Sequence, residues 1–358
     1  MTGQLAEVAA RNLTRRRIRF PALYGLPPVA AAYAALHRLE MRAVYQYILG
    51  KLHCDTTRTV LIFNGYLAPN ALLALAAQTL SMRCLYLENG FFPETMQCDP
   101  AGINALSTLP RDAAFYDGLS EADCGDGRPK SFVVRRSKLK DGGAAGASRT
   151  LPERYVFVPF QVPSDMQILA LSPWIRDMIH LYEEIAALAE AFPERHFVIK
   201  EHPSFPLSVQ GRVRAHPRIH FANGAVTSDL IDGATAIITV NSTVGLEALT
   251  LDRKVVTLGE AHYNIDGLVL HATDRTALRD AFARLDMWQP DAARRERYIR
   301  FVYNRFLIPL SRERPGPDAE RIIGRRAAGD DAYMRALAQW NRRTAGDETM
   351  HAAPRSSA

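Results

Sequence analysis

The stretch TAIITVNSTVGLEALTLDRKVVTL, residues 235–258, contains the pattern that decides the fold. Residues 235–240 form an apolar run and predict a buried strand, and residues 244–251 carry apolar side chains at helical spacing. Residues 254–258 form a second apolar run. Strand, helix and strand in this order predict two parallel strands joined by a crossover helix. Ligands of such a sheet bind beyond the carboxyl ends of its strands.

The same alternation continues on both sides of this stretch. Apolar runs predict further strands, and segments with helical spacing predict helices between them. The predicted strands are residues 59–63, 84–87, 155–159, 196–199 and 219–221, and the predicted helices are residues 68–80, 174–191 and 226–231. Residues 1–50 and 292–310 also have helical spacing. We therefore predict an α/β fold with two Rossmann-type domains, a cleft between them, and helical N- and C-terminal segments.

Composition marks the domain boundaries. Residues 130–150 contain closely spaced glycines and alanines between basic residues, which is typical of a flexible linker. We predict a first domain at residues 1–150, which ends in this linker, and a second domain at residues 151–311. The arginine-rich residues 312–358 are predicted to form a tail that is partly disordered.

The bulk composition excludes several classes of protein. A chain of 358 residues with 47% hydrophobic and 23% charged residues is typical of a soluble globular protein of more than one domain. The four cysteines have no CxxC spacing, so the sequence predicts neither a zinc site nor a disulfide scaffold. We find no signal-peptide pattern and no apolar run long enough to cross a bilayer. We therefore expect a cytoplasmic location.

The net charge of +6 predicts an anionic partner. The candidates are nucleic acid, an anionic membrane surface and an anionic small substrate. The sequence has no zinc-finger spacing and no RNA-binding aromatic motif, so we do not expect a nucleic acid partner. Arg15, Arg16, Arg17 and Arg19 form a basic cluster that is either a solvated surface or a patch for the inner face of the inner membrane. A basic side chain near anionic lipid gains about 1 kcal/mol.

Three loops of the second half carry candidate ligand-binding residues, and each follows a predicted strand. Because the strands are predicted to be parallel, the loops should converge on one edge of the sheet. The candidate residues are Gln161 and Ser164 in the first loop, Lys200, His202 and Pro203 in the second, and Asn241, Ser242, Thr243, Gly245 and Glu247 in the third.

The chemistry of these residues suits a nucleotide phosphate. Ser242 and Thr243 begin a predicted helix, whose free backbone N–H groups attract anions. Lys200 and His202 can offset phosphate charge, and Glu247 can accept hydrogen bonds from ribose hydroxyls. Each residue also has an ordinary explanation, such as a helix cap or a surface turn. The convergence of the three loops favours the phosphate site.

Two carboxylates of the first half are candidates for the chemical step. Glu88 and Asp99 lie near the end of a predicted strand. The possible acceptor or cleft residues are Asn64, Gly65, Asn89, Gly90, Asn104 and, from the second half of the chain, Tyr263. A carboxylate that faces a bound nucleotide can act as a base on an acceptor hydroxyl or as a nucleophile. The structural alternatives are a turn cap for Glu88 and an Asx-turn for Asp99. No metal-binding cluster, Walker A motif or GxGxxG motif is present, so we predict no metal and no cofactor.

The segments that carry these residues resemble the bacterial capsule polysaccharide biosynthesis and export family, whose members include β-Kdo transferases. The resemblance covers about residues 59–270 and is most specific in LYLENGFF, residues 85–92, and in DPAGIN, residues 99–104. The segments FQVPSD (160–165), KEHP (200–203) and NSTVGLEA (241–248) add to it, as does Tyr263. The motifs also resemble those of CMP-sialic acid enzymes.

The resemblance implies a GT-B-like fold and a metal-independent glycosyltransferase. Its expected donor is a CMP-activated acidic sugar such as CMP-Kdo, and its expected acceptor is a glycan or glycolipid of capsule or lipopolysaccharide type. The first domain would bind the acceptor and the second the CMP moiety, with His202, Ser242 and Thr243 on the phosphate and Glu88 in the acidic motif. The second acidic position of that motif is Asn89 here.

Two alternatives remain open at this stage. One is a transferase that uses a different nucleotide sugar, such as a UDP-linked one. The other is a non-catalytic export or assembly factor that keeps the fold, which Asn89 in the acidic motif favours.

Overall fold

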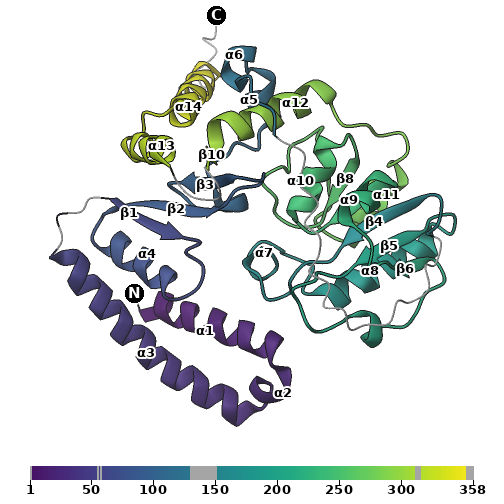
Figure 1. Ribbon diagram of the computed structural model, residues 1–358, viewed down its shortest axis with the longest axis horizontal. Helices are drawn as coiled ribbons and strands as arrows, with labels where there is room; N and C mark the ends of the chain where they lie inside the picture. The colour runs from purple at the N-terminus through teal and green to yellow at the C-terminus, as the bar shows by residue number, and fades with distance from the viewer. Residues whose placement is uncertain (1, 55, 57–58, 130–150, 311–315, 352–358) are drawn as a thin grey trace, which may run out of the picture.

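The computed structural model describes residues 2–54, 56, 59–129, 151–310 and 316–351, and it contains two sheets (Figure 1). The predicted linker at residues 130–150 lies outside the described residues. The first sheet has the order β1-β2-β3-β10, and the second has the order β6-β5-β4-β7-β8-β9. Both sheets are flanked by helices, so the α/β class predicted from the sequence is confirmed.

The second sheet is built from parallel strand pairs throughout. Its strands are β4 (Tyr155–Pro159), β5 (Phe197–Lys200), β6 (Ile219–Phe221), β7 (Ala234–Thr239), β8 (Lys254–Thr257) and β9 (Leu270–His271). Along the chain the strands are first added on one side of β4 and then, from β7 onwards, on the other side. The point where the strand order reverses therefore lies between β4 and β7, which is where sheets of this kind bind their ligands.

Helices cover both faces of this sheet, as the near-continuous apolar strands require. The helices are α8 (Met178–Ala191), α9 (Thr227–Asp232), α10 (Thr243–Thr250) and α11 (Arg275–Ala283). Successive residues of β4 point to opposite faces: Phe157 belongs to one core cluster, and Val156 and Val158 belong to another. The alternation shows that the sheet is buried on both sides.

The first sheet is smaller and mixed. Its strands are β1 (Thr59–Phe63), β2 (Arg83–Asn89), β3 (Thr95–Asp99) and β10 (Ile308–Pro309). β1 and β2 are parallel and are joined by the helix α4 (Asn70–Thr79), whereas β3 runs antiparallel to β2 and β10 antiparallel to β3. The first domain thus contains one strand-helix-strand unit extended by two antiparallel strands, a smaller sheet than the doubly wound one of the second domain.

The N-terminus is helical, as predicted. It consists of α1 (Thr2–Arg19), the short α2 (Pro21–Tyr24) and α3 (Pro27–His53). Leu5 and Val8 of α1, Tyr45 of α3 and Leu72 of α4 belong to one buried cluster. We call α1, α2 and α3 the N-terminal hairpin. Within the part of the chain that the structure describes, no helix is both long and apolar enough to cross a membrane.

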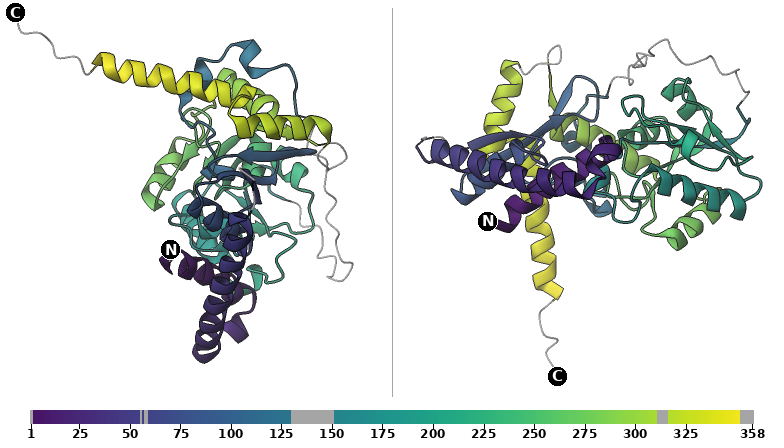
Figure 2. Two further views of the ribbon diagram at one scale, coloured as in Figure 1. Left: turned by 90° about the vertical axis from the view of Figure 1, so that its left-hand side faces the viewer. Right: turned by 90° about the horizontal axis from the view of Figure 1, so that it is seen from below.

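The C-terminal part of the chain returns to the first sheet. The predicted helix at residues 292–310 is divided into α12 (Ala292–Phe301), a π-helical turn (Val302–Phe306) and β10. Two further helices follow, α13 (Pro317–Ala328) and α14 (Ala332–His351). Figures 1 and 2 show α14 and the N-terminal hairpin at opposite ends of the first domain.

The arginine-rich tail is helical over α13 and α14, and residues 312–315 and 352–358 of the predicted tail lie outside the described residues. A buried ion pair holds α13 in place. Arg326 is 2% exposed, pairs with Asp331 and donates to the backbone carbonyls of Cys98, Arg305 and Phe306. These bonds attach α13 to the first sheet, so an arginine that looks like part of a solvated tail belongs to the core.

Short elements complete the structure. They are α5 (Ala113–Asp117), α6 (Glu121–Cys124), α7 (Met166–Leu169), and two 3-10 turns at Asn104–Leu106 and Gln210–Arg212. α5 and α6 pack against α12, and Arg294 of α12 pairs with Asp117 of α5 at 2.6 Å. The segment that follows the second sheet is thus held against helices of the first half of the chain.

Candidate functional site

Two buried amides join the loops at the point where the strand order of the second sheet reverses. Nε2 of Gln161, after β4, donates to Oδ1 of Asn241, after β7, at 2.9 Å. The backbone N–H of Asn241 donates to Oε1 of Gln161 at 3.1 Å, and its Nδ2 donates to the carbonyls of Gln167 and Leu171. Gln161 and Asn241, both predicted to bind the donor, therefore act as anchors that fix the spacing of the two loops.

Next to these anchors lies the N-terminus of α10. Ser242 caps the helix, because its Oγ accepts from the backbone N–H of Val244 at 3.2 Å. Thr243, the first helical residue, is exposed. The free N–H groups and the partial positive charge of a helix N-terminus attract anions. Ser242 and Thr243 thus lie at a helix N-terminus that can attract an anion.

Tyr263 holds the N-terminus of α10 in place. Its hydroxyl donates to the backbone carbonyl of Ser242, and its side chain is fully buried, which raises its pKa. A Cβ at Gly245 would lie 2.4 Å from the Tyr263 hydroxyl, so only glycine fits there. Tyr263 is a positioning residue of the second domain rather than a residue that lines a cleft.

The loop after β5 contains the exposed His202. The backbone N–H of Ser204 donates to Nδ1 of His202 at 3.2 Å. An Nδ1 that accepts leaves the proton of the neutral ring on Nε2, which is then a hydrogen-bond donor. The surrounding protein reduces the hydration of the ring and lowers its pKa, and the charge of Asp165 opposes this shift. His202 and the neighbouring Pro203 are both exposed.

Lys200 has a different place from the one predicted. Its Nζ donates to the carbonyl of Ala225 at 2.6 Å and to Oγ1 of Thr227 at 3.0 Å. Burial lowers its pKa. The ammonium group therefore holds the turn before α9 together and is not directed at a ligand.

The sequence motif also contains Glu201, whose role the sequence analysis missed. Its carboxylate accepts from Oγ of Ser208, from the backbone N–H groups of Val209 and Gln210, and from Nδ2 of Asn223 at 2.8 Å. Glu201 therefore shapes the loop that presents His202. A carboxylate directly after a strand and before His-Pro is the signal that could have identified it.

The two other predicted donor-site residues, Ser164 and Glu247, are buried or half-buried. Ser164 is 4% exposed, in the loop after β4. Glu247 is half-buried on α10, and burial together with the charge of Asp232 raises its pKa.

In the first domain, Glu88 and Asn64 meet at the carboxyl ends of β1 and β2. Nδ2 of Asn64 donates to Oε2 of Glu88 at 2.7 Å, and the backbone N–H of Asn89 donates to Oε1 at 2.9 Å. Asn64 and Gly65 have φ values of 64° and 81°, so the chain turns sharply at the end of β1. Glu88 is half-buried and Asn89 is exposed. The structure thus brings Asn64, Gly65, Glu88 and Asn89 together, as the sequence predicts.

Asp99, the other candidate carboxylate, is enclosed. It is 0% exposed, and Oδ1 accepts from the backbone N–H groups of Ala101 and Gly102. Oδ2 accepts from the backbone N–H and the hydroxyl of Thr108 at 3.0 and 2.6 Å. Burial raises the pKa of Asp99, and these hydrogen bonds oppose the rise because they stabilise the charged carboxylate. With both oxygens engaged, Asp99 holds the loop between residues 99 and 108 and cannot face a substrate, which corrects its prediction as a catalytic residue.

Gln97 is a second residue that the sequence analysis missed. It is 1% exposed, and its Nε2 donates to the carbonyl of Asn89 and to Oδ1 of Asn104, while its Oε1 accepts from the backbone N–H of Asn104. Gly90 lies against Thr95, where a Cβ would come within 1.9 Å of the Thr95 hydroxyl. Gln97 and Asn104 therefore fix the position of the strand end that carries Glu88.

A stack of aromatic rings holds this strand end against the second domain. The rings of Phe91 and His262 are parallel within 5°, with centroids 3.6 Å apart. Nδ1 of His262 lies 2.6 Å from the hydroxyl of Tyr298, and burial lowers the pKa of His262 to about 3. His262 is next to Tyr263, which contacts Ser242. This series of contacts connects the strand end of Glu88 to the N-terminus of α10.

Further contacts join the domains beside this stack. Arg111 of the first domain pairs with Glu260 of the second at 2.9 Å. Ile103 and Ala105 pack with Met166 and Leu171 in one buried cluster. The carboxylate of Glu88 and the donor loops therefore lie on two sides of one seam. Among the described residues, no group of three or more His, Cys, Asp or Glu side chains could hold a metal ion.

Comparison with known proteins gives the family. The family model described as capsule polysaccharide biosynthesis protein matches residues 136–296. Protein FixF of Sinorhizobium fredii is 42% identical over 316 residues, which is 87% of this chain and 76% of FixF. The capsule polysaccharide export protein KpsS of Escherichia coli is 26% identical over 256 residues, 54% of this chain and 64% of KpsS.

Solved structures show a more distant likeness. The β-Kdo 2,4 transferase of Thermosulfurimonas dismutans KpsC has a TM-score of 0.49 and 19% identity, with 75% of this chain and 87% of that chain covered. The β-Kdo 2,7 transferase of Thermosulfurimonas dismutans KpsC has a TM-score of 0.46 and 16% identity, with 78% of this chain and 88% of that chain covered. The family itself follows from the extent and identity of the match to FixF together with the family model. This chain belongs to the capsule polysaccharide biosynthesis family.

Proposed function

We propose that the protein is a metal-independent glycosyltransferase that transfers an acidic sugar, with Kdo as the expected one, from its CMP ester to a capsule- or lipopolysaccharide-type glycan or glycolipid. The observation that carries the proposal is the convergence of the loops after β4, β5 and β7 on one edge of the second sheet. This edge presents an exposed imidazole donor and an accessible helix N-terminus. The CMP-sugar itself is inferred from the sequence motifs described above.

The donor side would hold the CMP phosphate. Nε2 of His202 would donate to a phosphate oxygen, and the N-terminus of α10 at Ser242 and Thr243 would attract the negative charge. Gln161 and Asn241 would keep the two loops at the correct spacing through their mutual hydrogen bonds. These groups would also stabilise the charge that develops on the phosphate as CMP leaves.

The acceptor side would use Glu88 as the general base. Its carboxylate would take the proton of the acceptor hydroxyl while the hydroxyl oxygen forms a bond to the anomeric carbon. The bond from that carbon to the CMP phosphate oxygen breaks, and the electron pair leaves with CMP. Asn64 and Asn89 orient the Glu88 carboxylate by hydrogen bonds. Asn89 thus has a role beside the carboxylate, although it cannot itself act as a base.

The test measures CMP release from CMP-Kdo with candidate glycolipid acceptors, together with CMP binding by calorimetry. His202→Ala should weaken CMP binding about tenfold, by loss of a hydrogen bond to a charged group. Glu88→Gln should retain CMP binding and lower turnover at least about 100-fold. His53→Ala, at an exposed histidine in the last turn of α3, is the matched control and should change neither.

The outcomes separate the alternatives. CMP binding with no turnover for any acceptor, or turnover that Glu88→Gln leaves unchanged, would favour the non-catalytic export or assembly factor. Tighter binding of UDP than of CMP would favour a different nucleotide-sugar donor. Unchanged CMP binding in His202→Ala would refute the phosphate-binding role.

A further inference from the structure

The N-terminal hairpin contains all of the excess positive charge of the protein. Between residues 2 and 53 there are eight Arg or Lys residues and two Glu residues. The difference equals the net charge of the whole chain, +6, so the remaining residues are balanced. The two acidic residues are already paired, Glu7 with Arg11 and Glu40 with His37. The hairpin is thus a strongly cationic element on a neutral protein.

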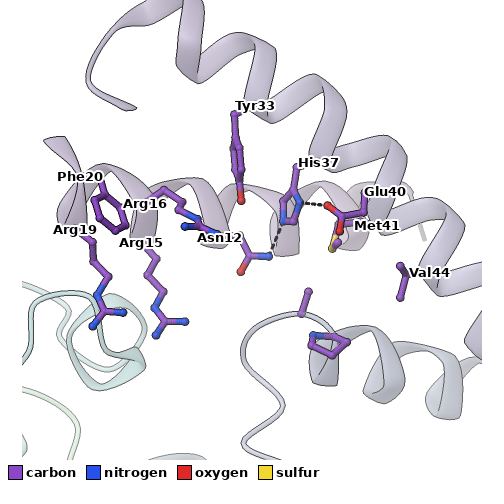
Figure 3. Close-up of a pocket in the computed structure, with 12 residues that line it drawn as sticks. Asn12, Arg15, Arg16, Arg19, Phe20, Tyr33, His37, Glu40, Met41 and Val44 are labelled. Carbon is purple, nitrogen blue, oxygen red and sulfur yellow. Dashed lines mark hydrogen bonds and ion pairs between the residues drawn. The ribbon is translucent and has the colours of Figure 1, made fainter. Parts of the chain in front are cut away.

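Three arginines of the hairpin line a cavity of about 560 Å³ between α1 and α3 (Figure 3). Figure 3 shows Arg15 and Arg19 at the opposite end of the cavity from Glu40, whose carboxylate bonds to Nδ1 of His37 at 2.7 Å. Among the described residues, no carboxylate lies within ion-pair distance of Arg15, Arg16 or Arg19. The cavity is large enough for a phosphate group, and a guanidinium group can bind phosphate through two parallel N–H donors.

Apolar side chains are exposed at the tip of the hairpin, directly after the arginines. Phe20, Leu23 and Leu26 are 52%, 51% and 51% exposed, and they surround the short helix α2 that joins α1 to α3. Phe20 also lines the cationic cavity. In Figure 1, α2 is at the lower end of the hairpin, away from both sheets. Large apolar residues at an exposed tip beside unpaired arginines are typical of an element that enters a membrane interface.

The apolar surface continues along α3. Leu36, Leu39 and Tyr47 are 69%, 61% and 67% exposed, and their spacing places them on one face of the helix. Arg42 and Lys51, which follow Leu39 and Tyr47 by three and four residues, flank this face. A helix that presents apolar residues flanked by basic residues can lie in the plane of a bilayer surface, with its apolar face buried about 5–10 Å deep.

We propose that the N-terminal hairpin is a membrane-docking element for anionic phospholipid, with Phe20, Leu23 and Leu26 inserted at the interface and Arg15, Arg16, Arg17 and Arg19 bound to lipid phosphates. The alternative occupant, a second copy of the chain, is disfavoured because two hairpins of the same high positive charge repel each other. An anionic bilayer complements both the charge and the exposed apolar tip. The proposal does not depend on the transferase reaction.

Vesicle flotation of the full chain tests the proposal. The vesicles contain phosphatidylcholine with between 0 and 40 mol% phosphatidylglycerol, so that charge is the only variable. Binding should rise steeply with phosphatidylglycerol and should weaken as salt screens the arginines. Arg16→Gln/Arg17→Gln/Arg19→Gln should lower the partition coefficient about 100-fold, and Leu23→Ser/Leu26→Ser about tenfold or more.

Matched controls use exposed residues of the second domain. Arg212→Gln/Arg279→Gln/Arg284→Gln removes the same charge, and Leu251→Ser/Met287→Ser removes exposed apolar surface. Both controls should bind vesicles nearly as well as the wild type. The substituted hairpin residues are exposed, so circular dichroism should confirm that all variants are folded.

Several results would overturn the proposal. They are equal binding to neutral and anionic vesicles, hairpin variants that bind like their matched controls, and a lipid-free dimer that Leu23→Ser/Leu26→Ser dissociates. The last result would show that a second copy covers the tip.

Discussion

Acidification should lower the free energy of unfolding through one buried imidazole, that of His262 in the seam between the domains. Its pKa is lowered to about 3 because the ring is buried between Phe91 and the second domain, with a further contribution from Arg111. In the unfolded chain the pKa returns to about 6.5. As the pH falls below 6.5, the unfolded state binds a proton that the folded state does not bind. The stability is therefore present above pH 6.5 and is lost progressively as the pH falls towards 3.

The size of this effect follows from the two pKa values. Between pH 7.5 and pH 5, His262 should remove about 2 kcal/mol of the free energy of unfolding, at 1.36 kcal/mol per pKa unit. Because pH 5 is far above the folded pKa, the result depends mainly on the unfolded value. Carboxylates and other histidines also titrate, so only the difference from a variant without the imidazole isolates this contribution.

The variant is His262→Phe, which keeps an aromatic ring against Phe91. Urea unfolding followed by tryptophan fluorescence at pH 7.5, 6.5, 5.5 and 5.0 gives the free energy for both proteins. Loss of the contact with the Tyr298 hydroxyl lowers the stability of the variant equally at each pH, so it cancels in the pH dependence. The wild type should lose about 2 kcal/mol more than the variant on going to pH 5. Equal losses would refute the reasoning.

Three further substitutions test other features of the structure. Asp99→Asn should lower the free energy of unfolding by about 2–3 kcal/mol while turnover per folded molecule stays unchanged; a selective loss of turnover would show that the carboxylate acts in the reaction. Arg326→Leu should lower the urea stability by about 3–5 kcal/mol, because Asp331 is left buried without its partner, and a change below 1 kcal/mol would contradict this. Gly245→Ala should cost about 1–3 kcal/mol by contact with the Tyr263 hydroxyl, and adding Tyr263→Phe should recover part of the loss; strictly additive effects would exclude the contact.

The second domain could be predicted from the sequence because its strands are apolar and separated by regular helices. The predicted strands at residues 155–159 and 219–221 have the bounds of β4 and β6, and the strand at 59–63 has those of β1. Each of these strands is specified by its own residues. The convergence of the loops then follows from parallel topology alone.

The parts that were missed depend on residues distant in the sequence. β3 has the sequence TMQCD, which alternates polar and apolar residues over only five positions, too short a pattern to identify a strand by itself, and β2 and β10 pair with it from both sides. Arg326 looks like part of a solvated tail until its carbonyl partners are known.

Within the candidate site, the sequence indicated which residues gather but not which are free to bind. Gln161, Asn241 and Lys200 are used for hydrogen bonds within the protein, whereas His202 and Thr243 are exposed. Asp99 and Glu88 are both carboxylates near one strand end, and only burial and hydrogen-bond partners distinguish them. Such differences are set by packing and leave no local sequence signal.

The pairing of β3 with β10 has a consequence for biosynthesis. About 210 residues separate the two strands, so at roughly 5–20 residues per second the ribosome needs on the order of 10–40 s to deliver the partner of β3. During that interval the edge of β3 is unpaired, and all strands of the second sheet are synthesised before the interval ends. The second domain should therefore fold first on the ribosome, and the first domain should close only when Ile308 and Pro309 arrive.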